Sequence, residues 1–266
     1  MGNGNRPVLW HIPISHYNEK VRWALDLKGV EHDRKAPNPH PPTAALLTRG
    51  KHATLPIMRI DGEIVHDSTA ILAKIEDRWP DPPLYPADPA DRQRALEIED
   101  WFDEQAAPHV RLLVWHETTR DRDSLDAFVG KYSPGPLRRF GPVAGAMVKS
   151  FVSLRYRVSD KDRASVARER VLAAFDHLEE ELGDGDYLVG NEFTVADLTA
   201  ASILYPIVTP PEGPEIATPP ALEELRAPLR DRRGYRWVEE TYRRHRNKGG
   251  AIKTQAAAST TAPGSA

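Results

Sequence analysis

Residues 54–71 read Thr-Leu-Pro-Ile-Met-Arg-Ile-Asp-Gly-Glu-Ile-Val-His-Asp-Ser-Thr-Ala-Ile, and this stretch decides the fold. Its apolar segment Leu55–Ile60 and the strand-like Glu63–His66 flank Asp61-Gly62, a dipeptide typical of tight hairpin turns. Asp67-Ser68 then supplies a helix start, because the apolar residues that follow share one helical face. The stretch therefore predicts a β-hairpin followed by a helix.

Upstream of the hairpin, the chain alternates strand-like and helix-like patterns. The apolar and aromatic run 8–12 predicts a strand, and the spacing of apolar residues over 16–28 predicts a helix that Gly29 ends. A short helix is expected at 43–47, after a proline-bearing stretch. The predicted order is βαβαββα, an α/β thioredoxin-like domain over residues 1–82.

Downstream, the strand signals disappear. Prolines crowd the segment around 83–90, which we interpret as the linker. Residues 91–246 are predicted to form an all-α domain. Within it, 130–158 is expected to be an irregular connection with one short helix, and 206–220, with six prolines, a long ordered loop or lid. The Ala- and Thr-rich tail 247–266 is expected to be disordered.

Composition limits the function classes. The 266 residues carry a net charge of −3, with 36 Lys plus Arg against 39 Asp plus Glu, so the balance predicts neither a nucleic-acid nor an anionic-membrane partner. No apolar run approaches the roughly 20 residues that span a bilayer, and we expect a soluble cytoplasmic protein. The chain has no cysteine, so any reactive sulfur has to come with a ligand.

The segment Ile14-Ser15-His16-Tyr17-Asn18 lies at the predicted turn from the first strand into the first helix. Unpaired N–H groups and the helix dipole favour an anion there, and a thiolate is such an anion. The Ser15 hydroxyl can donate a hydrogen bond that lowers a thiol pKa from its usual value of about 8.5. Ser15 can also be an ordinary helix cap.

Two further segments suit a peptide-like ligand. A cis peptide bond before Pro56 in Thr54-Leu55-Pro56 would expose the Leu55 backbone to such a ligand, although a trans turn is the commoner arrangement. At the helix start, Ser68 and free N–H groups can bind a carboxylate while Asp67 pairs with an amino group. The pair can equally cap the helix.

In this order, Ser-His-Tyr-Asn-Glu-Lys-Val-Arg-Trp-Ala-Leu (15–25), Thr-Leu-Pro-Ile-Met (54–58) and Asp-Ser-Thr-Ala-Ile (67–71) resemble the N-terminal half of cytosolic glutathione transferases. Gly190–Asp197 resembles that family's capping motif in the helical domain, with Thr194 and Asp197 forming a capping box. The matches cover residues 7 to about 246. They imply a thioredoxin-like N-terminal domain followed by an all-α domain.

The resemblance implies roles for single residues. Ser15 would activate the thiol of glutathione, and Thr54, Leu55 and Pro56 would bind its cysteinyl part. Asp67 and Ser68 would hold the γ-glutamyl end, and a cation would meet the glycyl carboxylate. Lys51, His52 and His40 are candidates for that cation, and the alignment does not choose among them. Glutathione is expected as co-substrate, without a tightly bound cofactor.

The family's electrophile site lies between the two domains, which implies the pocket residues Tyr17, His109, Leu112, Trp115 and His116, although Trp115 can equally pack in the core. His11 stands where tyrosine-type transferases carry their hydroxyl, so the chain looks more like the serine-type classes. His16 replaces a common proline, which affects the placement of Ser15. No H-E-x-x-H pattern occurs, and no metal is predicted.

We therefore expect a glutathione transferase that conjugates the thiolate to a small apolar electrophile, and the resemblance implies a homodimer. One alternative is an isomerase, dehalogenase or lyase that uses glutathione or another small thiol, because the inserts 130–158 and 206–220 would reshape the pocket. Another is a non-catalytic binding protein of the same fold. The sequence lacks G-x-S-x-G, Walker A and G-x-G-x-x-G patterns, so hydrolase, nucleotide-binding and dehydrogenase functions have no support.

Overall fold

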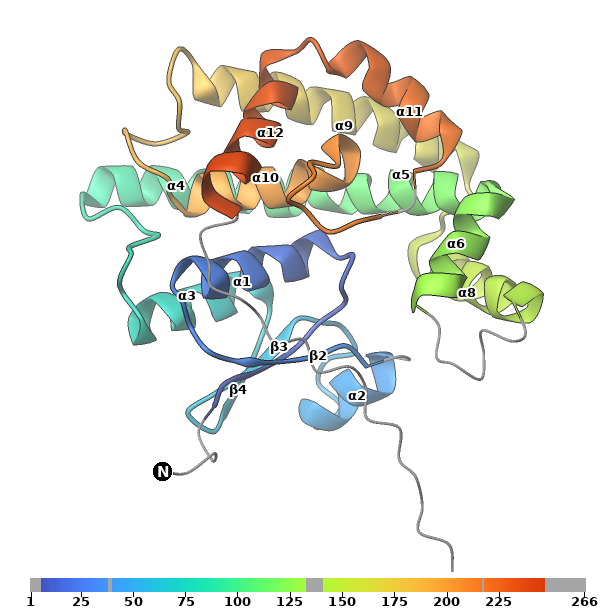
Figure 1. Ribbon diagram of the computed structural model, residues 1–266, viewed down its shortest axis with the longest axis horizontal. Helices are drawn as coiled ribbons and strands as arrows, with labels where there is room; N and C mark the ends of the chain where they lie inside the picture. The colour runs from blue at the N-terminus through green and yellow to red at the C-terminus, as the bar shows by residue number, and fades with distance from the viewer. Residues whose placement is uncertain (1–5, 38–39, 133–140, 217, 247–266) are drawn as a thin grey trace, which may run out of the picture.

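The structure is a computed structural model that describes residues 6–37, 40–132, 141–216 and 218–246 (Figure 1). The side chains of residues 40, 141 and 142 are also outside the description, as is the predicted tail 247–266. Within the described residues, no helix is long and apolar enough to cross a membrane.

The N-terminal domain is built on a mixed four-stranded sheet with the strand order β2-β1-β3-β4. β1 pairs in parallel with β2 and antiparallel with β3, and β3 pairs antiparallel with β4. Asp61 and Gly62 form the turn of this hairpin with φ values of 48° and 87°, as the Asp-Gly signal predicts. The strands are β1 (Val8–Trp10), β2 (Asp33–Lys35), β3 (Ile57–Ile60) and β4 (Glu63–His66).

Three helices complete this domain: α1 (His16–Leu27), α2 (His40–Leu47) and α3 (Ser68–Arg78). Figure 1 shows α1 and α3 between the sheet and the helical domain, with α2 on the other side of the sheet. The observed order βαβαββα confirms the predicted thioredoxin-like fold.

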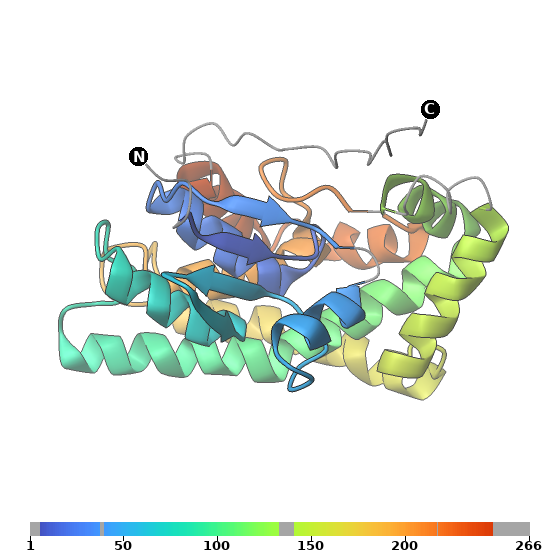
Figure 2. The ribbon, with the colours of Figure 1, turned by 90° about the horizontal axis from the view of Figure 1, so that it is seen from below.

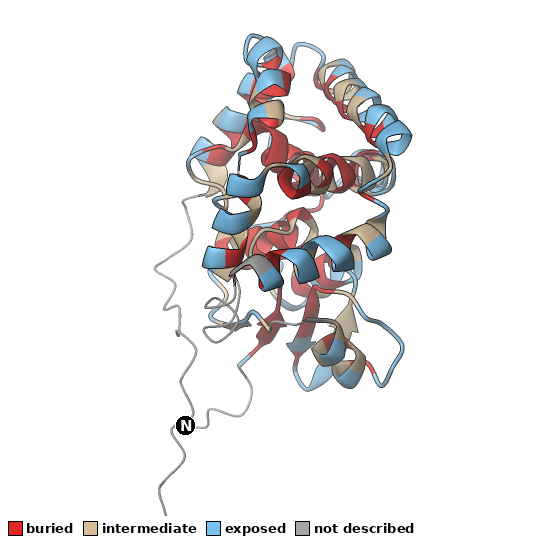
Figure 3. Ribbon diagram, turned by 90° about the vertical axis from the view of Figure 1, so that its right-hand side faces the viewer, coloured by how far each residue is buried: buried red, intermediate tan, exposed pale blue. Residues whose placement is uncertain are grey.

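The C-terminal domain is all-α, as predicted. Figure 2 shows α4, a π-helical turn (η1) and α5 as one long helical run. The helix α10 is buried along its whole length and contacts α1, α4, α5 and α12 (Figure 3). The elements are α4 (Pro89–Trp101), η1 (Phe102–Ala106), α5 (Ala107–Arg120), α6 (Arg122–Tyr132), α8 (Gly141–Tyr156), α9 (Lys161–Leu182), α10 (Val195–Val208), α11 (Pro220–Arg226), the 3₁₀ turn η2 (Ala227–Leu229) and α12 (Arg233–His245).

Two segments are more helical than the sequence predicts. Instead of one short helix, 130–158 contains α8, which is 16 residues long and packs against α6. Pro206 lies inside α10 rather than in a loop. The guanidinium of Arg226 donates to the carbonyls of Pro206 and Ile207, at 3.2 and 2.5 Å, so the end of this buried helix keeps its hydrogen-bond partners.

The capping motif before α10 forms the predicted capping box. The Asp197 carboxylate accepts hydrogen bonds from the backbone N–H groups of Thr194 and Leu188, both at 2.8 Å. Burial nevertheless raises the pKa of Asp197 to about 6. Next to this cap, the ring of Phe193 stacks on Trp23 of α1 at 5.7 Å, so the motif also joins the two domains.

Candidate functional site

Ser15 occupies the N-cap position of α1 in extended backbone conformation, with φ −82° and ψ 128°. Its side chain makes no hydrogen bond to the helix N–H groups. Instead, its Oγ accepts a hydrogen bond from Nδ2 of Asn18 at 2.7 Å. The hydroxyl thus stands at the positive end of the helix without serving as a cap.

The loop that precedes Ser15 is fixed from two sides. The buried guanidinium of Arg22 donates to the carbonyls of Ile12 and Pro13, at 3.1 and 2.8 Å. The Tyr205 hydroxyl, which comes from α10, donates to the carbonyl of Ile14 at 2.5 Å. Both domains therefore hold the backbone at the start of α1.

The segment 54–56 lies next to this loop. The Leu55-Pro56 peptide bond is cis, and both residues are buried. Nδ2 of Asn18 donates to the Leu55 carbonyl at 3.2 Å, which joins this segment to Ser15. The Thr54 hydroxyl lies 3.2 Å from Nε2 of His66. The structure thus brings the predicted residues Ser15 and Leu55 together through a residue that we had not predicted.

The start of α3 combines a helix cap with a buried hydroxyl. Asp67 has a left-handed φ of 80°, and its carboxylate accepts from the N–H groups of Thr69 and Ala70, so it caps the helix. Ser68 is buried. Lys51 and His52 are exposed, and the ring of His52 stacks on His66 at 3.7 Å. The side chain of His40, at the start of α2, lies outside the described residues.

A buried charge cluster connects this helix start to the second domain. Lys20 Nζ lies 3.0 Å from Glu99 Oε1 and 2.5 Å from Asp103 Oδ2, and the Thr69 hydroxyl lies within hydrogen-bond distance of the same two oxygens, at 3.1 and 3.0 Å. Although burial disfavours the ammonium ion, the two carboxylates raise the pKa of Lys20. Burial raises the pKa of Glu99. Two carboxyl groups share one cation, so the cluster is short of positive charge.

A second group of side chains lies where α1, α5 and α8 meet. The guanidinium of Arg111 sits over the rings of Tyr17 and Tyr156, at 5.8 and 4.6 Å from their centres. The Tyr17 hydroxyl donates to the Asp103 carbonyl at 3.1 Å, and burial raises the Tyr17 pKa to about 12. Burial also lowers the pKa of His16, which packs against Tyr17, to about 3.

The other residues predicted for the electrophile pocket point in different directions. Leu112 is buried in the main core. His116 is buried too, and its Nδ1 donates to the Val158 carbonyl at 2.5 Å. Trp115 packs edge-on against Phe128 of α6. Burial and then Arg170 and Arg163 of α9 lower the pKa of His109, which places this residue near α9. Of the predicted pocket residues, Tyr17 is the one whose ring lies under the Arg111 guanidinium in the described part of the chain.

Sequence reasoning missed Asn18, Thr69, Asp103 and Arg111. Asn18 and Thr69 lie inside the motifs that we quoted, so a search for every hydrogen-bonding side chain in those motifs could have found them. Arg111 and Asp103 carry no such signal, because their neighbours are remote in sequence.

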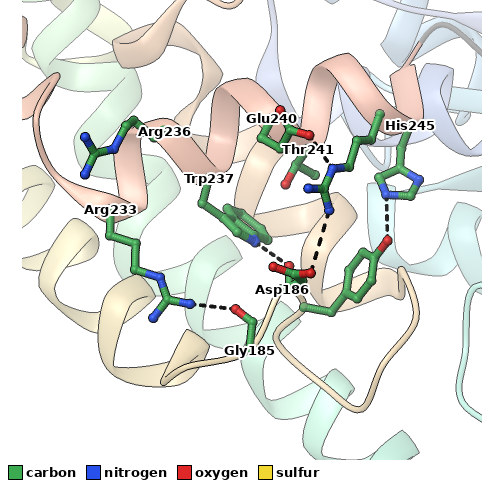
Figure 4. Close-up of a pocket in the computed structure, with 10 residues that line it drawn as sticks. Gly185, Asp186, Arg233, Arg236, Trp237, Glu240, Thr241 and His245 are labelled. Carbon is green, nitrogen blue, oxygen red and sulfur yellow. Dashed lines mark hydrogen bonds and ion pairs between the residues drawn. The ribbon is translucent and has the colours of Figure 1, made fainter.

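The described residues contain no group of three or more His, Asp or Glu that could hold a metal ion. A cavity of about 200 Å³ lies between the turn 185–187 and α12, lined by Trp237 and several arginines (Figure 4). None of the predicted site residues lines it.

Comparisons with known proteins give the family. The model of the glutathione S-transferase N-terminal domain matches residues 9–83, and that of the C-terminal domain matches residues 89–238. Two relatives are a glutathione S-transferase of Triticum aestivum, 39% identical over 85 residues (31% of this chain), and a probable maleylacetoacetate isomerase 1 of Drosophila melanogaster, 32% identical over 105 residues (35% of this chain). The chain spans 38% and 40% of their lengths.

Among solved structures, the theta-class glutathione S-transferase of Xanthomonas axonopodis pv. citri with glutathione bound is 21% identical, with a TM-score of 0.55. The alignment covers 88% of this chain and 97% of that one, which shows the shared fold. With both family domains matched in order over most of its length, the chain belongs to the glutathione S-transferase family.

Proposed function

We propose that this protein binds glutathione and conjugates its thiolate to a small electrophile, with Ser15 as the hydrogen-bond donor to the sulfur. The observation that carries the proposal is the position of the Ser15 hydroxyl, which stands at the N-terminus of α1 without capping it. The helix dipole and this donor both favour a thiolate over a thiol. Each unit of pKa depression gives tenfold more thiolate at a pH well below the pKa.

The rest of glutathione would follow the loops around Ser15. The backbone of Leu55 and Pro56, with Thr54, would bind the cysteinyl part. Asp67 and Ser68 would bind the γ-glutamyl end, and the carboxyl groups of Glu99 and Asp103 behind Thr69 favour an ammonium group nearby. Lys51, His52 or His40 would meet the glycyl carboxylate.

Chemistry in such a site needs no acid–base pair from the protein. Once the thiol has released its proton to solvent, the thiolate sulfur attacks the electrophile; with an aryl halide, a carbon–sulfur bond forms and the carbon–halogen bond breaks to release halide. The rate depends on thiolate concentration and on how closely the two reactants are held. The electrophile would lie beside Tyr17, where α1 and α5 meet. We also propose a homodimer located in the cytoplasm.

A second candidate is a glutathione-dependent isomerase that acts on an anionic substrate. Arg111 favours it, because this cation stands beside Tyr17 and forms no ion pair with any carboxylate among the described residues. The relative named as a probable maleylacetoacetate isomerase also supports this candidate. Such a reaction would use the same thiolate, so Ser15 would keep its role.

The experiment that tests the proposal compares the wild-type chain with Ser15→Ala. Conjugation of an aryl halide should fall by about tenfold or more in the variant, while glutathione still binds. Ser150→Ala, an exposed change on α8, is the matched control and should leave turnover intact. Equal turnover in wild type and Ser15→Ala would rule out the serine assignment.

A further inference from the structure

Asn18 uses its whole amide group within the candidate site. The residue is fully buried, and three partners surround it. Its Oδ1 accepts from the backbone N–H of Ile12 at 3.1 Å, and its Nδ2 donates to the Leu55 carbonyl at 3.2 Å and to Ser15 Oγ at 2.7 Å. One side chain thus connects the end of the first strand, the cis-proline segment and the serine.

The backbone partners fix which way this amide faces. A backbone N–H can only donate and a backbone carbonyl can only accept, so the oxygen of Asn18 has to face Ile12 and its nitrogen has to face Leu55. The second N–H of the same nitrogen then points at Ser15 Oγ. Exchanging the amide oxygen and nitrogen would place two donors together at Ile12 and two acceptors together at Leu55.

This orientation also decides the direction of the Ser15 hydroxyl. Because Asn18 fills an acceptor position of Oγ, the serine hydrogen cannot point toward Asn18 and has to be donated elsewhere. We infer that Asn18 is a positioning residue that turns the Ser15 hydroxyl hydrogen toward the glutathione sulfur. The inference rests on the proposed function and goes beyond it, since it assigns a role to a residue that touches no substrate.

Asn18 also sets the spacing of the two binding elements. Ser15 would contact the sulfur and Leu55 the backbone of the same cysteinyl residue, and both lie within 3.2 Å of one nitrogen atom. A donor held in advance loses less entropy on meeting the thiolate than a freely rotating hydroxyl.

The test is the pKa of the bound glutathione thiol, followed by thiolate ultraviolet absorbance in wild type, Asn18→Ala, Ser15→Ala and the double variant. We expect Asn18→Ala to raise this pKa, by about one unit or less, and to add almost nothing once Ser15 is gone, because the two residues act in series. Asn18→Asp keeps the side-chain volume, and its carboxylate can only accept, so it should draw the serine hydrogen away and raise the thiol pKa further. Asn191→Asp makes the same charge change at an exposed position and should leave the pKa unchanged.

The inference is wrong if the thiol pKa of both Asn18 variants equals that of the wild type. It is also wrong if Asn18→Ala shifts this pKa as much in the Ser15→Ala background as it does in the wild-type background. Each variant is also titrated with glutathione by calorimetry. A variant that binds glutathione is folded, so a change in its thiol pKa is not due to loss of the fold. If the wild-type chain binds no glutathione, the proposed function fails, and the inference fails with it for that distinct reason.

Discussion

The hydroxyl of Tyr205 donates to the backbone carbonyl of Ile14 at 2.5 Å, so the most buried helix of the second domain holds the residue next to Ser15. We predict that Tyr205→Phe lowers the free energy of unfolding by about 1–2 kcal/mol, because the Ile14 carbonyl loses its donor. Urea denaturation measures this change. An unchanged unfolding midpoint would show that the contact contributes nothing to stability.

Lys20→Met should lower the free energy of unfolding by more than Tyr205→Phe does. The variant leaves the carboxyl groups of Glu99 and Asp103 buried without their cation, a change that typically costs about 3–5 kcal/mol. Lys74→Met is the matched control, since the pair of Lys74 with Glu63 is solvent-exposed and should matter little. The prediction is wrong if the two variants unfold at the same denaturant concentration.

Acid should destabilise the protein through His16. Burial lowers the pKa of this histidine to about 3 in the folded chain, against 6.5 when unfolded, so the unfolded state binds more protons between these values. Stability should therefore fall as the pH falls through this window, by about 1.4 kcal/mol per pH unit from this group. In His16→Phe, the plot of unfolding free energy against pH should be shallower by that amount. An identical slope would contradict the prediction.

Tyr17→Phe should leave the pKa of the bound thiol unchanged. The Tyr17 hydroxyl is committed to the Asp103 carbonyl, and its own pKa is about 12, so it neither donates to the sulfur nor titrates near neutral pH. The pH dependence of kcat/KM measures this, with Ser15→Ala as the comparison. A rise in the thiol pKa in Tyr17→Phe would assign the activating hydroxyl to Tyr17 instead.

Arg111→Met should separate electrophiles by charge. With the guanidinium removed from beside Tyr17, we expect KM for a carboxylate-bearing electrophile to rise about tenfold or more, and KM for a neutral aryl halide to change little. Steady-state kinetics with both substrates checks this. Equal effects on the two substrates would show that Arg111 acts only through packing.

Local signals account for the parts of the fold that the sequence predicts. The hairpin at Asp61-Gly62 and the capping box of Thr194 and Asp197 depend on residues within a few positions of one another, so their geometry can be predicted without knowing the fold. Pro206 shows the limit of such reasoning. It favours a loop locally, whereas packing around α10 and the guanidinium of Arg226 keep it helical.

The residues of the candidate site also fall into two groups, those that local sequence signals indicate and those that depend on packing between separate elements. Ser15, Leu55 and Ser68 stand in short motifs at a helix start, a turn and a second helix start, so residue type and position suggest them. The roles of Asn18 and Arg111 depend on contacts between separate elements, such as Asn18 with Leu55 and Arg111 with Tyr156. Those contacts exist only once the two domains are packed.

The measurement that tests the central claim most directly is a calorimetric titration of the full chain with glutathione. We predict saturable binding that persists in Ser15→Ala, because the serine acts on the thiol pKa while the backbone of Leu55 and the start of α3 hold the rest of the tripeptide. A titration of the folded wild-type chain that shows no glutathione binding would contradict the account.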